Sequence, residues 1–296
     1  MSRQLRPWPV GRPLAVALSV MYEQWAPGAA PGLGPMGNPL PGGLLDRQAL
    51  SWAAYGPRTG IWLLLDELAA RELCASVHVS GILSETAPAS VAAVAAAGHE
   101  LCAHAWSQDR LVTSPDAAAE RAEIARCVEG LAAAAGRRPT GWISPRCTPS
   151  ERTASLLADA GFRWFGDVFD TDLPYPLSTP AGTIVALPFG LDVNDLPLNV
   201  RHGQPARELS ATFEHVVEAL LHEGRSTHLD VTVHAHVSGG PPAWAHFARS
   251  STSPRHVTCG SPPGAASSTR WTPDLTYSRW CRPGSPRRTY AGPGPA

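Results

Sequence analysis

Side chains that can transfer protons stand at the ends of three apolar runs in this sequence. Glu23 and His104 each close a short apolar run, and a third run closes with His234. In repeating strand–helix folds the carboxyl ends of the strands meet at one edge, where catalytic groups gather. A carboxylate that takes a proton and an imidazole that returns it are typical of hydrolytic enzymes. We therefore expect these residues to form one site in a hydrolase.

Each of these residues also has an ordinary structural interpretation. A carboxylate after a strand can be a solvated loop acid, and a lone histidine at a strand end is more often a buried core residue than a catalyst. His234 and His236 are two positions apart and share one face of a strand. His99 and His104 are five positions apart and face opposite sides, so only one of them can point into the site. We expect His99 to pack or cap instead.

Two further charged residues follow later apolar runs. Arg146 follows the run 140–144, where a guanidinium is suited to clamp a carboxylate of the enzyme or of a substrate. Asp172 lies in the acidic stretch 167–172, which is either a substrate rim or an ordinary turn. Individually these signals are weak, but at strand ends of one repeating fold they reinforce each other.

The elements that position these residues alternate along the chain. Strands are expected at 14–20, 74–80, 99–104, 140–144, 162–166, 183–188 and 228–234. Helices are expected at 60–72, 88–97, 115–135, 149–160 and 207–223. Strands that alternate with helices of this length predict an α/β fold with a parallel sheet or barrel. Seven strands favour a distorted (β/α)7-type barrel, and the pattern leaves open whether it closes or stays incomplete.

Local signals mark the boundaries of two helices and one long loop. Ser114-Pro115-Asp116 offers an N-cap with proline at the first helical position. Thr148-Pro149-Ser150-Glu151 has the pattern of a capping box, and Gly161 is placed to end the helix that follows. The segment 27–57 is rich in Gly and Pro and shows no period. Because it follows Glu23, we expect it to be a lid over the site.

The periodic pattern ends after His236. Residues 239–296 contain ten Pro and a single Leu, a composition that cannot bury enough apolar surface to offset its ordering entropy. The sequence therefore predicts a catalytic domain at 1–238 and a disordered tail at 239–296. The formal net charge of −1 divides into +6 for the tail and −7 for the remainder. An acidic body argues against nucleic acid as a partner.

The cysteines and the first apolar run bear on the compartment. Six Cys occur without a CxxC pair or regular spacing, which favours free thiols in a reduced, cytoplasmic setting. The run 14–20 is too short to span a membrane, and no small-residue cleavage site follows it. We expect a cytoplasmic protein without a membrane partner.

Residues 14 to about 240 resemble the polysaccharide deacetylase superfamily, which includes chitooligosaccharide and peptidoglycan deacetylases. Within it, the sequence is most similar to the branch of metal-independent allantoinases. The resemblance rests on motifs that follow one another in the family's order. They are Tyr22-Glu23-Gln24, Tyr55-Gly56-Pro57-Arg58-Thr59-Gly60-Ile61-Trp62, Gly98-His99-Glu100 with His104, Gly141-Trp142 through Arg146 and Pro149-Ser150, Asp170 through Tyr175, and Val233-His234.

The sequence departs from the metal-dependent deacetylases at two ligand positions. Where those enzymes have an acid and a second histidine as zinc ligands, this chain has Gln24 and Gln108. Of the family's ligand set only His104 is retained, and one imidazole with two neutral amides is a poor zinc site. The resemblance therefore implies a hydrolase that needs no cofactor, or at most binds zinc weakly through His104.

The resemblance also implies roles for individual residues. Glu23 is expected to act as general base, His234 as general acid, and Arg146 to orient the Glu23 carboxylate. His104, Trp106 and Asp172 are expected to line the substrate pocket. Burial under the 27–57 loop should raise the pKa of Glu23, and the nearby carboxylate should keep His234 charged.

The function implied is hydrolysis of a carbon–nitrogen bond other than a peptide bond. The substrate would be a small molecule or an oligosaccharide: an N-acetylated sugar that is deacetylated, or a ureide such as allantoin. The alternative is a carbohydrate-binding protein that keeps the deacetylase fold but has lost catalytic activity together with its metal ligands. Self-association into a homo-oligomer is left open.

Overall fold

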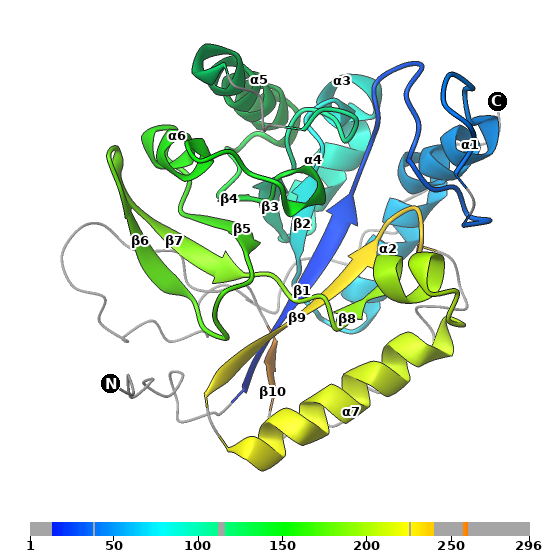
Figure 1. Ribbon diagram of the computed structural model, residues 1–296, viewed down its shortest axis with the longest axis vertical. Helices are drawn as coiled ribbons and strands as arrows, with labels where there is room; N and C mark the ends of the chain where they lie inside the picture. Colours follow the sequence, from blue (N-terminus) through cyan, green and yellow to red (C-terminus); the bar gives the residue numbers. More distant parts are fainter. Residues whose placement is uncertain (1–13, 38, 112–115, 225, 240–256, 260–296) are drawn as a thin grey trace.

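The computed structural model describes residues 14–37, 39–111, 116–224, 226–239 and 257–259. Its centre is one curled sheet with the strand order β6-β7-β5-β4-β3-β2-β1-β9-β8, and β10 lies beside β1 (Figure 1). All neighbouring strands run parallel except β6 and β7. The strands are β1 (Leu14–Tyr22), β2 (Ser76–Val79), β3 (Glu100–Ala103), β4 (Gly141–Trp142), β5 (Trp164–Val168), β6 (Tyr175–Thr179), β7 (Gly182–Pro188), β8 (Val193–Asn194), β9 (Thr227–His234) and β10 (Val257–Cys259).

Helices connect the parallel strands and cover the outer face of the sheet (Figure 1). The α-helices are α1 (Arg47–Tyr55), α2 (Ile61–Ala70), α3 (Leu83–Thr86), α4 (Pro88–Ala96), α5 (Ala117–Ala135), α6 (Thr153–Asp159) and α7 (Arg207–Glu223). Short turns of other helix types are η2 (Gly56–Gly60, π), η3 (Pro145–Cys147, 3-10) and η4 (Leu196–Arg201, π). The predicted α/β class with a distorted, incomplete barrel is confirmed.

The two faces of the sheet bury different side chains. On β1, Val16, Val20 and Tyr22 join the main apolar core, which packs against the helices. The alternate residues point into the curl, where Met21 packs in a second buried cluster with Trp164 and others. This alternation follows from the period of two in a strand. It also directs the residue after Tyr22 toward the interior.

In the described part of the chain, the sheet ends at β6 on one side and at β8 on the other, and these two edge strands do not pair with each other. The segment between β7 and β8 crosses the gap instead (Figure 1). Gly190 donates its backbone N–H to the Asp230 side chain of β9. A Cβ on Gly190 would lie only 3.0 Å from the Asp230 carbonyl oxygen, a tight contact that glycine avoids. The loop after β7 thus bonds to β9, while the sheet itself stays an incomplete barrel.

All seven expected strands and all five expected helices are present. Sequence analysis missed β6, β8, β10, α1 and α3. The expectation that 27–57 lacks regular structure is wrong in its last third, where α1 begins after Asp46, whose side chain accepts from the Ala49 N–H at 2.9 Å. Ala49 and Ala53 supply its buried stripe, which is too small a signal to mark a helix by hydrophobicity.

Two predicted helix starts are wrong. Residues 112–115 lie outside the described part, and α5 is capped by Asp116, which accepts from the Ala118 N–H at 2.9 Å. The capping box at 148–151 does not form: the Thr148 hydroxyl donates to the Pro145 carbonyl at 2.7 Å, and α6 begins only at Thr153. Gly161 has φ +81° and follows the end of α6, as expected.

The expected tail at 239–296 falls mostly on residues outside the described part. Of these positions, Gly239 follows the turn after β9, and Val257–Cys259 form β10, which pairs in parallel with Leu14–Val16 of β1. No helix in the described ranges is long and apolar enough to cross a membrane.

Candidate active site

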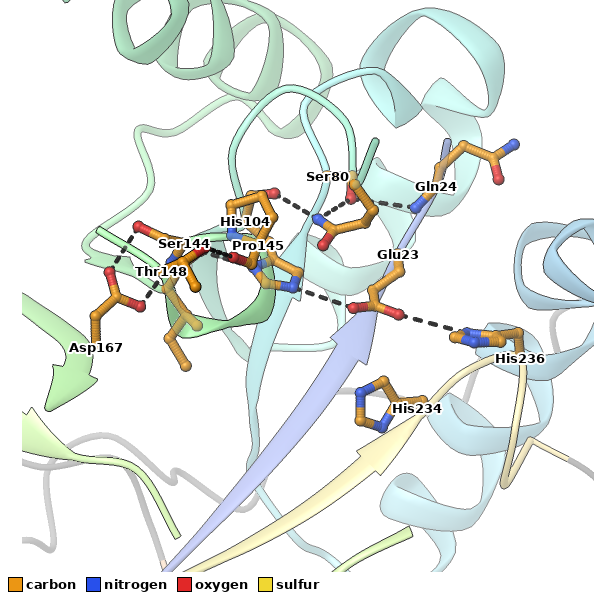
Figure 2. Close-up of polar contacts among 12 residues, drawn as sticks. Glu23, Gln24, Ser80, His104, Ser144, Pro145, Thr148, Asp167, His234 and His236 are labelled. Carbon is orange, nitrogen blue, oxygen red and sulfur yellow. Dashed lines mark hydrogen bonds and ion pairs between the residues drawn. The ribbon is translucent and has the colours of Figure 1, made fainter. Parts of the chain in front are cut away.

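The carboxyl edge of the sheet brings Glu23, His104, His234 and His236 together (Figure 2). Glu23 directly follows β1 and His104 directly follows β3. His234 is the last residue of β9 and pairs in register with Met21. The predicted gathering of one carboxylate and the strand-end imidazoles is therefore present. His99 is buried at the opposite end of β3, where its carbonyl accepts from Arg137, and it does not reach this edge.

Glu23 lies among three imidazoles. Its Oε1 is 3.3 Å from Nε2 of His104, and its Oε2 is 3.8 Å from Nδ1 of His236. Burial disfavours the charged carboxylate, but the positive charge of His234, the hydrogen bond with His104 and the charge of His236 outweigh it and lower the pKa of Glu23 to about 2. The expected upward shift is wrong, because desolvation is only one of the opposing effects. Glu23 is ionised throughout the neutral range.

His234 is held by a buried acid that the sequence analysis did not identify. Its Nδ1 lies 2.6 Å from Oδ1 of Asp195, and its backbone N–H donates to Oδ2 of the same side chain at 2.8 Å. Burial favours a neutral ring, yet the carboxylates of Asp195 and Glu23 raise the pKa of His234. The charged form expected for His234 is thus favoured. Asp195 follows a strand of only two residues, which no periodicity could have revealed.

The two other imidazoles differ in their surroundings. Nδ1 of His104 lies 2.7 Å from the carbonyl oxygen of Ile143, which only accepts, so Nδ1 carries a hydrogen and Nε2 faces Glu23. His236 is buried, and desolvation outweighs the attraction of Glu23 and lowers its pKa to about 4. His236 therefore stays neutral at a pH at which the charged form of His234 is favoured.

Arg146 does not take the position expected for it. It is exposed and has φ +56°, and among the described residues no hydrogen bond or ion pair joins it to Glu23. Its guanidinium lies beside the loop glycine Gly32. The turn that carries Arg146 is fixed by Asp167, whose carboxylate accepts hydrogen bonds from the Ser144 N–H at 2.8 Å and from its hydroxyl at 2.6 Å (Figure 2). This turn directs Arg146 outward, away from the Glu23 carboxylate.

Trp106 and Asp172 lie outside the site, so their expected role in the pocket is wrong. Trp106 is buried on the helical side, with the Arg126 guanidinium 3.6 Å from its ring centroid. There it lines a groove of about 460 Å³ between α3, α4 and α5. Asp172 is exposed, and its backbone carbonyl accepts from the His228 N–H at the start of β9. His228 precedes His234 by six residues, about 20 Å along a strand.

The donors at this edge do not fit zinc. His104 is oriented by a backbone carbonyl, as metal-binding histidines are. However, the Gln24 side chain points away from the cluster (Figure 2). The Gln108 side-chain nitrogen is bonded to the Ser80 hydroxyl and the His104 carbonyl, at 3.0 and 2.8 Å. Among the described residues, no three His, Cys, Asp or Glu side chains are grouped to hold a metal ion. Zinc prefers imidazole, thiolate and carboxylate ligands, and Glu23 and the neighbouring imidazoles, although close, do not form a group of three that could hold it.

Comparison with known proteins finds one matching family. Residues 54–165 match the family model for polysaccharide deacetylases. This segment of the chain is similar to polysaccharide deacetylases. The fold of the chain is similar to that of the probable polysaccharide deacetylase of Pseudomonas aeruginosa PAO1, with a TM-score of 0.74 and 25% identity over 84% of this chain and 88% of the other. No curated protein sequence matches the chain.

The chain is equally similar in fold to PuuE allantoinase. That structure superimposes with a TM-score of 0.74 and 24% identity over 84% of this chain and 88% of the other. The family match and the fold thus confirm the sequence resemblance to the polysaccharide deacetylase superfamily.

Proposed function

We propose that the protein hydrolyses the carbon–nitrogen bond of a non-peptide amide, with Glu23 as general base and His234 as general acid. One observation carries this proposal: an ionised carboxylate and an imidazole charged by the buried Asp195 face the same space at the carboxyl edge. This is the pair of protonation states that acid–base hydrolysis requires before substrate binds.

In the first step, Glu23 takes a proton from a water molecule whose oxygen attacks the amide carbon. A carboxylate with a pKa of about 2 is a weak base on its own. However, the strongest influence lowering that pKa is the positive charge of His234. When His234 gives up its proton, this influence disappears and Glu23 becomes more basic. Proton uptake by Glu23 and proton release by His234 therefore favour each other.

In the second step, the tetrahedral intermediate loses its amine. His234 donates a proton to the leaving nitrogen while the carbon–nitrogen bond breaks, and a carboxylic acid and an amine are formed. Asp195 keeps the ring in one orientation, because it accepts from Nδ1 and from the backbone N–H of the same residue. His104 lies beside the base, with its Nε2 3.3 Å from Oε1 of Glu23 and its Nδ1 2.7 Å from the Ile143 carbonyl oxygen.

We propose that this chemistry does not depend on a bound metal, because the donor set at the edge does not fit zinc. For the substrate, we propose either an N-acetylated sugar or a ureide such as allantoin. The similarity of the fold to a polysaccharide deacetylase and to an allantoinase supports both.

A substrate panel tests the proposal. Purified protein is incubated with chitooligosaccharides and with allantoin, with chelator or with added zinc, and acetate release and ring opening are measured. Turnover of either substrate in the presence of chelator is the expected result. Binding of unmodified oligosaccharide without turnover under any condition would instead favour the alternative, a carbohydrate-binding protein that has lost catalysis.

A further inference from the structure

Two tryptophans enclose the imidazole of His236 at the edge of the site. The Trp52 ring lies edge-to-face against it, with centroids 4.5 Å apart, and the Trp25 ring does the same at 5.5 Å. Both tryptophans are half-buried, whereas His236 is 2% exposed. Among the described residues its Nδ1 has no hydrogen-bond partner, and it faces Oε2 of Glu23 at 3.8 Å. A buried imidazole is thus held by aromatic rings beside the carboxylate.

The backbone around His236 is fixed by the helical segment that carries Trp52. The π-turn η2 continues α1, and a Cβ on Gly56 would lie 3.7 Å from the His236 Cβ. A Cβ on Gly60 would lie 1.8 Å from the carbonyl oxygen of Ala235, so only glycine permits this approach. Trp52 and the two glycines therefore contact the same short segment after β9 from one side.

We propose that Trp52 is a positioning residue: together with Trp25 it fixes the His236 ring so that Nδ1–H is directed at Glu23, and this contact orients the carboxylate for catalysis. The inference rests on the proposed function of Glu23. The distance of 3.8 Å is longer than a hydrogen bond. Catalytic hydrogen bonds of this kind shorten when substrate is bound. α1, which lies within the segment that follows Glu23, is then a part of the active site.

The charges that act on His236 are those of Glu23, His234 and Asp195. Arg47 of α1 and Arg58 of η2, the basic side chains on the segment packed against His236, are exposed. His236 is therefore kept neutral by its burial, which the aromatic rings provide, and not by a neighbouring cation on α1. A neutral ring donates to Glu23 without adding a second full positive charge beside His234.

A double-mutant cycle tests the proposal. kcat and KM are measured for Trp52→Ala, His236→Ala and the double variant, with Trp52→Phe as the conservative replacement. We expect Trp52→Ala to lower kcat by on the order of 10- to 100-fold through misplacement of the base. The double variant should lose no more than His236→Ala alone, because Trp52 acts through His236. Trp52→Phe keeps the edge-to-face contact and should restore most of kcat. Ser51→Ala, on an exposed neighbour in α1, is the matched control and should leave kcat unchanged.

Wild-type kcat in Trp52→Ala, or losses that add in the double variant, would overturn the proposal. NMR titration of the His236 ring gives a readout that does not need turnover. Its pKa should be about 4 in the wild type and move toward the ordinary value in Trp52→Ala, and an unchanged titration would also overturn the proposal. Full activity in Glu23→Gln would refute the proposed function itself, and the NMR result would then still decide whether Trp52 holds His236.

Discussion

Replacing Asp195 by Asn should disable the proposed acid while keeping the shape of the site. In the native protein both carboxylate oxygens of Asp195 are used by His234, at 2.6 Å to Nδ1 and 2.8 Å to the backbone nitrogen. The carboxylates of Asp195 and Glu23 raise the pKa of His234. Without the charge at position 195, His234 loses its proton at lower pH. We expect kcat to fall by on the order of 100- to 10,000-fold at neutral pH.

The same substitution has a predictable effect on stability. A hydrogen bond to a charged group contributes about 1.5–3 kcal/mol. No discount for solvent screening applies here, because His234 is 5% exposed. The pKa of His234 is raised in the folded state, so its contribution is fully present below the unfolded value of about 6.5 and is lost as the pH rises through the folded value. Asp195→Asn should therefore destabilise the protein more at pH 6 than at pH 9.

The assay is the pH dependence of kcat/KM for the wild type and Asp195→Asn, together with urea unfolding at both pH values. The wild type should show a bell-shaped profile. In the variant, the alkaline limb of the profile should lie at lower pH than in the wild type. An alkaline limb at the same pH in both proteins would refute the assignment of His234 as the acid held by Asp195. Equal destabilisation at pH 6 and pH 9 would refute the argument from the pKa.

Further expectations concern the backbone, the metal and the interior. Gly60→Ala should lower kcat by on the order of 100-fold, because its Cβ would lie 1.8 Å from the Ala235 carbonyl oxygen and displace His234 and His236. Gly42→Ala is the control, because a Cβ at Gly42 would have no atom within 4 Å. Chelator should leave activity unchanged, and elemental analysis should find well under one zinc per chain; stoichiometric zinc lost together with activity would show that the ligands are misplaced. Burial raises the pKa of Asp230 to about 6, above its ordinary value of 3.8, so stability should fall as the pH rises through this range. Asp230→Asn should flatten that fall in urea unfolding, and an unchanged slope would contradict the burial argument.

The sequence predicted the parts of the fold that long apolar periods determine. The run that becomes β1 is long and apolar, and that of β9 alternates apolar and polar residues, so their ends, and with them Glu23 and His234, could be located. Asp195 could not be found, because its short strand has no period and its side chain acquires its role only when β8 lies beside β9. Trp52 was not identified because the buried face of α1 consists of alanines, which give too weak a hydrophobic pattern to predict the helix that carries it.

The wrong assignments have a common physical cause. Arg146, Trp106 and Asp172 were placed by their nearness in sequence to a strand end, but the backbone directs each of them elsewhere. The left-handed conformation at Arg146 turns it outward, and Trp106 packs onto α5. For Glu23, burial was foreseen correctly, but the summed effect of three imidazoles on its pKa depends on distances that only the folded chain sets.

The central claim is that Glu23 acts as a metal-independent base for amide hydrolysis. Its most direct test is kcat/KM of Glu23→Gln against the wild type, both treated with chelator, on whichever panel substrate the wild type turns over. Gln keeps the size of the side chain and removes the base, so we expect a loss on the order of 100- to 10,000-fold with an unchanged circular dichroism spectrum and melting temperature. Retention of most of the activity by Glu23→Gln would contradict the account.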